Sequence, residues 1–155
     1  MKPAAGMAAA ALLLGSCIAQ AQLPGAAPGD AKVVFAPRIA STPDGGRELV
    51  LDASIAEGWV LYASDFEQPD VGPQVARLTA KDGTATDGAL ASVAAKEGHG
   101  SNFAGDYRYT YFTDKGQFRQ RLASRDGPVN AEIRAQACFE ESGLCELVRQ
   151  RIAVR

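Results

Sequence analysis

A period of two in the apolar residues is the feature that most limits how this chain can fold. Between residues 48 and 55 the apolar side chains alternate with more polar neighbours, as Leu49, Leu51, Ala53 and Ile55 against Glu48, Val50, Asp52 and Ser54. Successive side chains of a strand point to opposite faces, so this alternation indicates a strand with one face in a core. No comparable helical stripe appears, and we therefore predict an all-β protein.

The same pattern continues over most of the chain. Further strands are predicted at residues 32–37, 59–63, 74–80, 89–95, 107–112, 117–123, 129–138 and 146–154. Short turn sequences such as Asp82-Gly83 separate them. Many short strands with frequent turns are typical of an immunoglobulin-like antiparallel β-sandwich. A length of 155 residues fits one such domain, and a net charge of −2 predicts no basic surface for the phosphates of nucleic acid and hence no nucleic-acid partner.

The first residues have the features of an export signal. A basic residue precedes an apolar run at residues 7–14, and Ala-Gln-Ala at residues 19–21 is a small-residue cleavage site. The predicted organisation is a signal peptide at residues 1–21, a linker at 22–31 and a periplasmic domain at 32–155. In a competing interpretation Cys17 is the lipidated first residue of a lipoprotein, and only then is the domain tethered to a membrane.

Two cysteines, Cys138 and Cys145, remain after removal of the signal, in a compartment where disulfides form. The strands predicted on either side of them alternate in the same way and can form a hairpin. One face is apolar, and the opposite face carries Asn130, Glu132, Arg134, Gln136 and Cys138 on the first strand and Leu147, Arg149, Arg151 and Ala153 on the second. A hairpin of this kind brings the two thiols within bonding reach.

Two functions are consistent with a disulfide at this place. The simpler is a staple of about 2.5 kcal/mol in an immunoglobulin-like binding or assembly module, because C-x6-C spacing is not itself a redox signature. The alternative is a redox pair at one end of the sandwich, open to the thiolate of a partner. Glu140, Glu141 and Glu146 oppose thiolate formation, whereas Arg134 and Arg149 favour it. We therefore predict thiols with a high pKa.

Four segments carry a more specific pattern. They are Gly58-Trp59-Val60-Leu61-Tyr62, Phe103-Ala104-Gly105 with the strand at 107–112, residues 118–122, and residues 132–149 (EIRAQACFEESGLCELVR). In this order they resemble the N-terminal periplasmic domain of the thiol:disulfide interchange protein DsbD, also described as the disulfide-bond-corrector domain. The resemblance spans residues 35–154 and implies an immunoglobulin-like sandwich whose cysteines cycle between dithiol and disulfide.

The resemblance also implies roles for individual residues. Cys145 takes the position of the sulfur that forms the mixed disulfide, and Cys138 that of the sulfur that resolves it. Phe103 falls on an aromatic position of a cap loop that shields the sulfurs until a partner docks, and Tyr62 falls on an aromatic position near the site. The sequence departs from the family where Glu146 follows the second cysteine in place of the frequent prolines.

The partners are implied in the same way. In that family the domain accepts electrons from a membrane-embedded reductase through a thioredoxin-like domain, and passes them to periplasmic thiol proteins. The resemblance implies a component of a protein-disulfide reductase system, without a cofactor or a metal. This sequence has no membrane-spanning or thioredoxin-like portion. It must either use a reductase from another chain or have lost the redox role, and the presence of both cysteines favours the first.

The remaining aromatic and imidazole side chains have simpler interpretations. Trp59 is predicted to lie in the core. Tyr107, Tyr109 and Tyr111 alternate on one strand face, where packing explains them better than a ligand platform. His99 lies between two glycines and is predicted to be a solvated loop residue rather than a proton shuttle.

Overall fold

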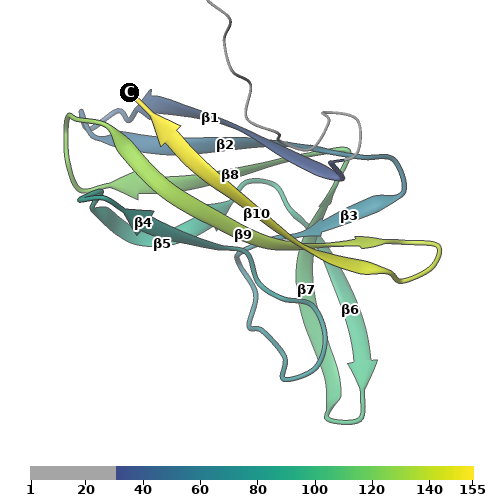
Figure 1. The fold of residues 1–155 in the computed structure, drawn as a ribbon. Coiled ribbons are helices and arrows are strands. Elements are labelled where there is room, and N and C mark those ends of the chain that lie inside the picture. Colours follow the sequence, from purple (N-terminus) through teal and green to yellow (C-terminus); the bar gives the residue numbers. More distant parts are fainter. Residues whose placement is uncertain (1–30) are drawn as a thin grey trace, which may run out of the picture.

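The computed structural model describes residues 31–155, which form ten strands and no helix (Figure 1). The strands are β1 (Val33–Ser41), β2 (Arg47–Ile55), β3 (Trp59–Tyr62), β4 (Arg77–Lys81), β5 (Thr86–Ser92), β6 (Lys96–Asn102), β7 (Gly105–Thr113), β8 (Lys115–Leu122), β9 (Val129–Phe139) and β10 (Cys145–Val154). Residues 31–155 therefore include no helix that could cross a membrane. The predicted signal peptide, Cys17 and the predicted linker up to residue 30 lie outside the described residues.

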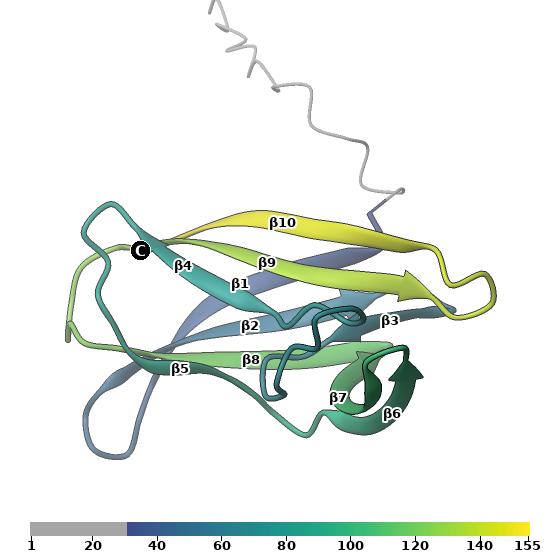
Figure 2. The ribbon, with the colours of Figure 1, turned by 90° about the horizontal axis from the view of Figure 1, so that it is seen from below.

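All strand pairs are antiparallel, and they form one hydrogen-bonded sheet that folds into two layers. The main path runs β1-β2-β8-β7-β3-β9-β10, with β4 paired to β9, β5 to β8 and β6 to β7. Figure 2 shows β10, β9 and β4 in one layer and β1, β2, β8 and β5 in the other. The β6–β7 hairpin projects from this body. The predicted antiparallel β-sandwich is thus confirmed.

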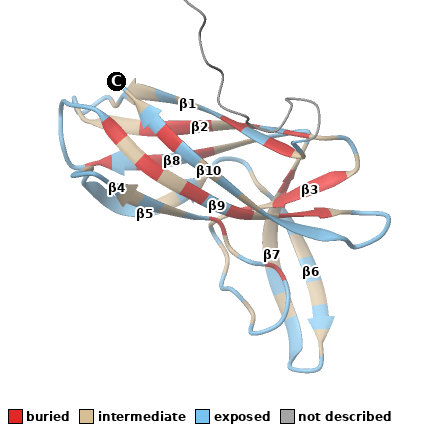
Figure 3. Ribbon diagram, in the orientation of Figure 1, coloured by how far each residue is buried: buried red, intermediate tan, exposed pale blue. Residues whose placement is uncertain are grey.

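The core lies between the two layers and is built from the inner faces of the strands. Alternate residues of β9 are buried, which Figure 3 shows as repeated red segments along this strand. Leu49 of β2 and Ile133 of β9 are completely shielded. The ring of Phe118 lies 5.3 Å from that of Phe112 and 6.1 Å from that of Phe35, measured between centroids. Because Phe35 belongs to β1, Phe112 to β7 and Phe118 to β8, the packing of these rings stabilises the contact between the three strands in the core.

A side-chain amide joins the two layers at one edge of the sandwich. Gln150 on β10 accepts a hydrogen bond from the Phe35 backbone N–H at 3.0 Å, and its Nε2 donates to the Phe35 carbonyl oxygen at 2.7 Å. The amide therefore makes the two bonds that the backbone of a neighbouring strand would make. Through Gln150, β10 is attached to β1 although the two strands are not paired.

The prediction of a loop around His99 is wrong, because residues 96–102 form β6 and pair along their whole length with β7. A Cβ added at Gly98 would lie 2.4 Å from the Tyr109 ring, and one at Gly100 would lie 2.4 Å from the Tyr107 ring. The rings cover a strand that has no side chains at these positions, which offsets the weak strand preference of glycine. His99 is exposed, as predicted, but it is exposed on a strand.

Candidate functional site

Cys138 and Cys145 form a disulfide across the β9–β10 hairpin. The two residues are direct partners in the register of β9 and β10, and their Cα atoms are 4.0 Å apart. The connecting turn is closed by hydrogen bonds from the Phe139 N–H to the Leu144 carbonyl and from the Gly143 N–H to the Phe139 carbonyl, each 2.8 Å. The predicted hairpin with its bracketing cysteines is confirmed.

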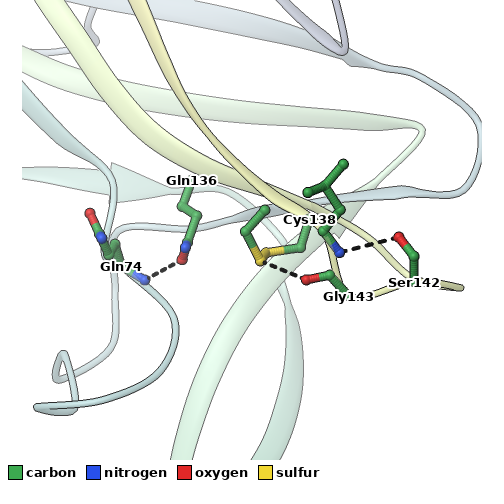
Figure 4. Close-up of a disulfide and its surroundings, with 7 residues drawn as sticks. Gln74, Gln136, Cys138, Ser142 and Gly143 are labelled. Carbon is green, nitrogen blue, oxygen red and sulfur yellow. Dashed lines mark hydrogen bonds between the residues drawn. A yellow bond between two sulfur atoms is a disulfide. The ribbon is translucent and has the colours of Figure 1, made fainter.

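The two sulfur-bearing residues differ in their access to solvent. Cys138 is 6% exposed and lies opposite Val60 of β3, which is itself 9% exposed. Cys145 is exposed, and its Sγ lies 3.4 Å from the Gly143 carbonyl oxygen (Figure 4). A group that approaches from solvent therefore meets Cys145, while Cys138 is covered by the protein.

Two exposed leucines flank the accessible cysteine. Leu144 precedes Cys145 and is 60% exposed, and Leu147 follows it by two positions and is 44% exposed. Exposed apolar groups beside a reactive atom offer contact area to a partner. Neither leucine was among the site residues predicted from the sequence. The available signal was Leu147 itself, an apolar residue on the otherwise polar outer face predicted for its strand.

The side-chain amide of Gln136, two residues before Cys138 on β9, binds a neighbouring segment of the chain. The Gln136 side-chain oxygen accepts a hydrogen bond from the Gln74 backbone N–H at 2.8 Å (Figure 4). Gln74 belongs to the long connection between β3 and β4, which is thereby held against β9 two residues before Cys138. The connection is therefore anchored to the strand that carries Cys138, in addition to the pairing of that strand with β3.

Charged groups surround the pair as the sequence analysis anticipated. Glu140, Glu141 and Glu146 are exposed, and none of them forms an ion pair within residues 31–155. Arg134 and Arg149 are direct partners in the register of β9 and β10. Arg134 lies four residues before Cys138, and Arg149 lies four residues after Cys145. The carboxylates are thus closer to the sulfurs in sequence than the guanidinium groups are.

Of the two aromatic residues implied by the resemblance, the structure brings one into the region of the disulfide. Tyr62 follows Val60 on β3, and its ring meets that of Tyr109 edge-on at 5.4 Å. Burial raises the pKa of the Tyr62 phenol above its usual 10.0, so the group is neutral at ordinary pH. Phe103 lies at the tip of the β6–β7 hairpin and is 89% exposed. In Figures 1 and 2 this tip lies away from the β9–β10 turn.

The comparisons with known proteins identify the fold. No protein-family model matches the sequence, and no curated protein matches it. The structure is similar to the N-terminal periplasmic domain of ScsB from Proteus mirabilis, with a TM-score of 0.55 and 15% identity over 83% of this chain and 48% of that one. The present chain therefore spans about half the length of that structure.

Two solved structures of the DsbD N-terminal domain from Neisseria meningitidis are also similar. The reduced form has a TM-score of 0.46 and 20% identity, over 77% of this chain and 83% of that one. A structure of its complex with the PilB N-terminal domain has a TM-score of 0.47 and 19% identity, over 77% and 80%. At the level of fold, the chain is similar to the ScsB domain, and the predicted immunoglobulin-like antiparallel β-sandwich is confirmed.

Proposed function

We propose that this protein is a periplasmic thiol–disulfide exchange domain that works through the Cys138–Cys145 pair. The observation that carries the proposal is the unequal access of the two sulfurs, since Cys145 is exposed beside two exposed leucines and Cys138 is 6% exposed. A disulfide that only closes a hairpin needs neither an open sulfur nor an apolar border. The periplasmic location is supported by the fold shared with the ScsB domain and by the export signal predicted at residues 1–21.

The exchange proceeds in two balanced steps. A thiolate of the electron donor attacks the Cys145 sulfur, a new disulfide forms between the two proteins, and Cys138 leaves as a thiolate that takes up a proton. A second thiolate of the donor then attacks its own sulfur in the mixed disulfide and releases Cys145. The donor dithiol is oxidised to a disulfide, and the domain gains two electrons and two protons. The reverse sequence reduces a disulfide in an acceptor.

The donor in this proposal is a thioredoxin-like domain or a membrane thiol–disulfide reductase, and the acceptors are periplasmic thiol proteins. The domain comprises residues 32–155 and would be one component of a protein-disulfide reductase system. Tyr62 contributes to shielding from its position beside Val60. Phe103 would shield the sulfurs only after the β6–β7 hairpin moves toward the β9–β10 turn, because its side chain is 89% exposed at the hairpin tip.

The reduction potential of the pair tests the proposal directly. Equilibration in dithiothreitol or glutathione buffers, followed by alkylation of free thiols, should give a potential above about −300 mV with the domain still folded. After activation of Cys145 with an aromatic disulfide, the Cys138→Ala variant should form a lasting mixed disulfide with a reduced thioredoxin whose resolving cysteine is replaced by serine, and the aromatic thiol is released. The matched Cys145→Ala variant should trap much less, because Cys138 is covered.

A lower potential, or reduction only upon unfolding, would reject the exchange function. The disulfide would then be a staple in an immunoglobulin-like binding module.

A further inference from the structure

Three arginines stand side by side across the strand that carries Cys138. Arg77 of β4 is the direct cross-strand partner of Arg134 of β9, and Arg134 is the direct partner of Arg149 of β10. Direct partners in an antiparallel pair share a face, so the three side chains leave the sheet on the same side. All three are exposed, and in the part of the chain that the structure describes none of them forms an ion pair. We call Arg77, Arg134 and Arg149 the arginine row.

The arginine row does not serve the stability of the sheet. Like charges that lie directly opposite each other on paired strands are destabilising. Two more cations, Lys81 and Arg151, occupy outward positions of the same three strands, against the single carboxylate of Glu132. The outer face of β4, β9 and β10 is therefore positively charged, although the whole chain has a net charge of −2.

The arginine row and the disulfide share that face. Arg134 precedes Cys138 by four residues, and Arg149 follows Cys145 by four. An even separation keeps side chains on one side of a strand, and four residues correspond to about 13 Å along it. On β9 and β10 the positions between the two sites on this face are Gln136 and its partner Leu147, and Gln74 of the β3–β4 connection is bonded to Gln136. A protein that covers Cys145 and Leu147 therefore extends naturally onto the arginines.

A second charged region of the surface, formed by other segments of the chain, has the opposite sign. A groove between the β3–β4 connection and the β6–β7 hairpin is lined by Asp65, Glu67, Asp70, Glu97 and Asp106, with Arg108 as its one guanidinium. The β3–β4 connection that lines this acidic groove also reaches β9, where the Gln74 N–H donates to the Gln136 side chain between Arg134 and Cys138. Such a division orients an approaching charged partner, because only one alignment places opposite charges together.

We propose that the arginine row binds a carboxylate-rich surface of the protein that exchanges disulfides with Cys145, and so sets the orientation of docking. Guanidinium groups pair with carboxylates in a bidentate geometry. The three arginines are spread over three strands of an open face, which suits the surface of a protein better than one small anion. This inference rests on the proposed function, since it names the chemistry of the partner at the same disulfide.

Peptides that differ only in charge provide the test. One peptide carries a cysteine, a short Gly/Ser spacer and a run of glutamates, and its match has glutamines in place of the glutamates. The rate constant for reduction of the Cys138–Cys145 disulfide is measured for each peptide at low salt. For the glutamate peptide, the Arg134→Gln/Arg149→Gln variant should react about tenfold more slowly than the wild type, and added salt should reduce the difference.

A matched control separates a local effect from a change in net charge. The Arg38→Gln/Arg119→Gln variant loses the same two charges from the other outer face, and it should react with both peptides as the wild type does. The glutamine peptide measures the effect of the arginines on the reacting thiolates alone, and its rates should differ between the three proteins much less than those of the glutamate peptide. Comparing proteins for one peptide removes the effect of the glutamates on the pKa of the peptide thiol.

Binding without exchange provides the second readout. A glutamate peptide with serine in place of its cysteine should bind the wild type more tightly than the Arg134→Gln/Arg149→Gln variant in fluorescence anisotropy. Equal rates and equal binding for these two proteins would overturn the inference. Arginine-dependent binding to phosphatidylglycerol vesicles without binding to the peptide would also overturn it and assign the face to a membrane. A wild type that binds the serine peptide but reacts with no thiol while folded would instead reject the proposed function alone.

Discussion

The two outer faces of the sandwich use arginine in opposite ways. On the face of β1, β2 and β8, Arg38 bonds to Asp52 at 3.0 Å and Arg119 lies 3.5 Å from a Glu48 carboxylate oxygen. On the face of β4, β9 and β10, the arginine row has no carboxylate partner among residues 31–155. The first face balances its charge within the chain, and the second leaves its charge available to another molecule. The disulfide lies on the second.

The arginines of the two outer faces also differ in whether they cover apolar side chains. Val50 points outward from β2, yet it is completely shielded, with Arg38 and Arg119 as its cross-strand partners on either side. Long arginine side chains cover apolar surface with their methylene groups while the charged end remains in water. On the first face the arginines therefore support the fold through packing. No buried apolar residue lies between the members of the arginine row, so we expect little structural loss when they are replaced.

The largest predicted difference is between two neighbours on β9. Ile133 is fully buried, and its replacement by alanine should lower the free energy of unfolding by about 2–5 kcal/mol. Arg134 is exposed, and Arg134→Ala should change it by less than about 0.5 kcal/mol. Urea titration followed by circular dichroism measures both. A loss for Arg134→Ala comparable to that for Ile133→Ala would mean that the arginine row is part of the fold after all.

The alternation that separates Ile133 from Arg134 could be read from the sequence, because it depends on residues two positions apart. The cysteine hairpin could be predicted for the same reason, since both strands and their turn are contiguous. The arginine row could not. It depends on the register of β4 against β9, two strands separated by β5 to β8 in the chain. Strand β6 was not predicted, because its glycines have a weak preference for strands and the tyrosine rings that cover them belong to β7.

The second prediction concerns the edge where the two layers meet. Gln150→Ala removes the amide that pairs with the Phe35 N–H and carbonyl groups, and it should lower the free energy of unfolding by about 1–3 kcal/mol. Gln136→Ala is the matched control, since that amide makes a single bond to an exposed loop and should cost less. Denaturant midpoints compare the two. Equal losses would show that Gln150 does not join β10 to β1 energetically.

The Gln150 contact also shows where sequence reasoning ends. Phe35 and Gln150 are 115 positions apart, and no local pattern relates them. Gln150 alternates with Val148, Ile152 and Val154 on the side of its strand that is otherwise apolar, where an amide is unfavourable unless its polar atoms are paired. The amide at an otherwise apolar position indicates that Gln150 has a hydrogen-bond partner inside the protein. The sequence does not identify that partner as the Phe35 backbone.

The smallest predicted effect is the pH dependence of the two faces. A hydrogen bond from the Gln117 amide at 2.7 Å, followed by the effect of Arg38, lowers the pKa of Asp52 below its usual 3.8. Because the folded protein holds the carboxylate more strongly than the unfolded chain does, this stabilisation is complete above pH 3.8. It is lost as the pH falls through the lower pKa of the folded state. The effect is small, since the carboxylate is mostly exposed.

Denaturant midpoints between pH 5 and pH 2 test this point in two variants. Asp52→Asn should lose less stability than the wild type as the pH falls, because it has no carboxylate to protonate at that site. Arg134→Gln should give a curve parallel to that of the wild type, since the arginine row has no carboxylate partner in the described structure whose protonation would break an ion pair. A flattened curve for Arg134→Gln would indicate that Glu132 or another acid pairs with the row in solution. The charge of that face would then be engaged by the protein itself and less available to a partner.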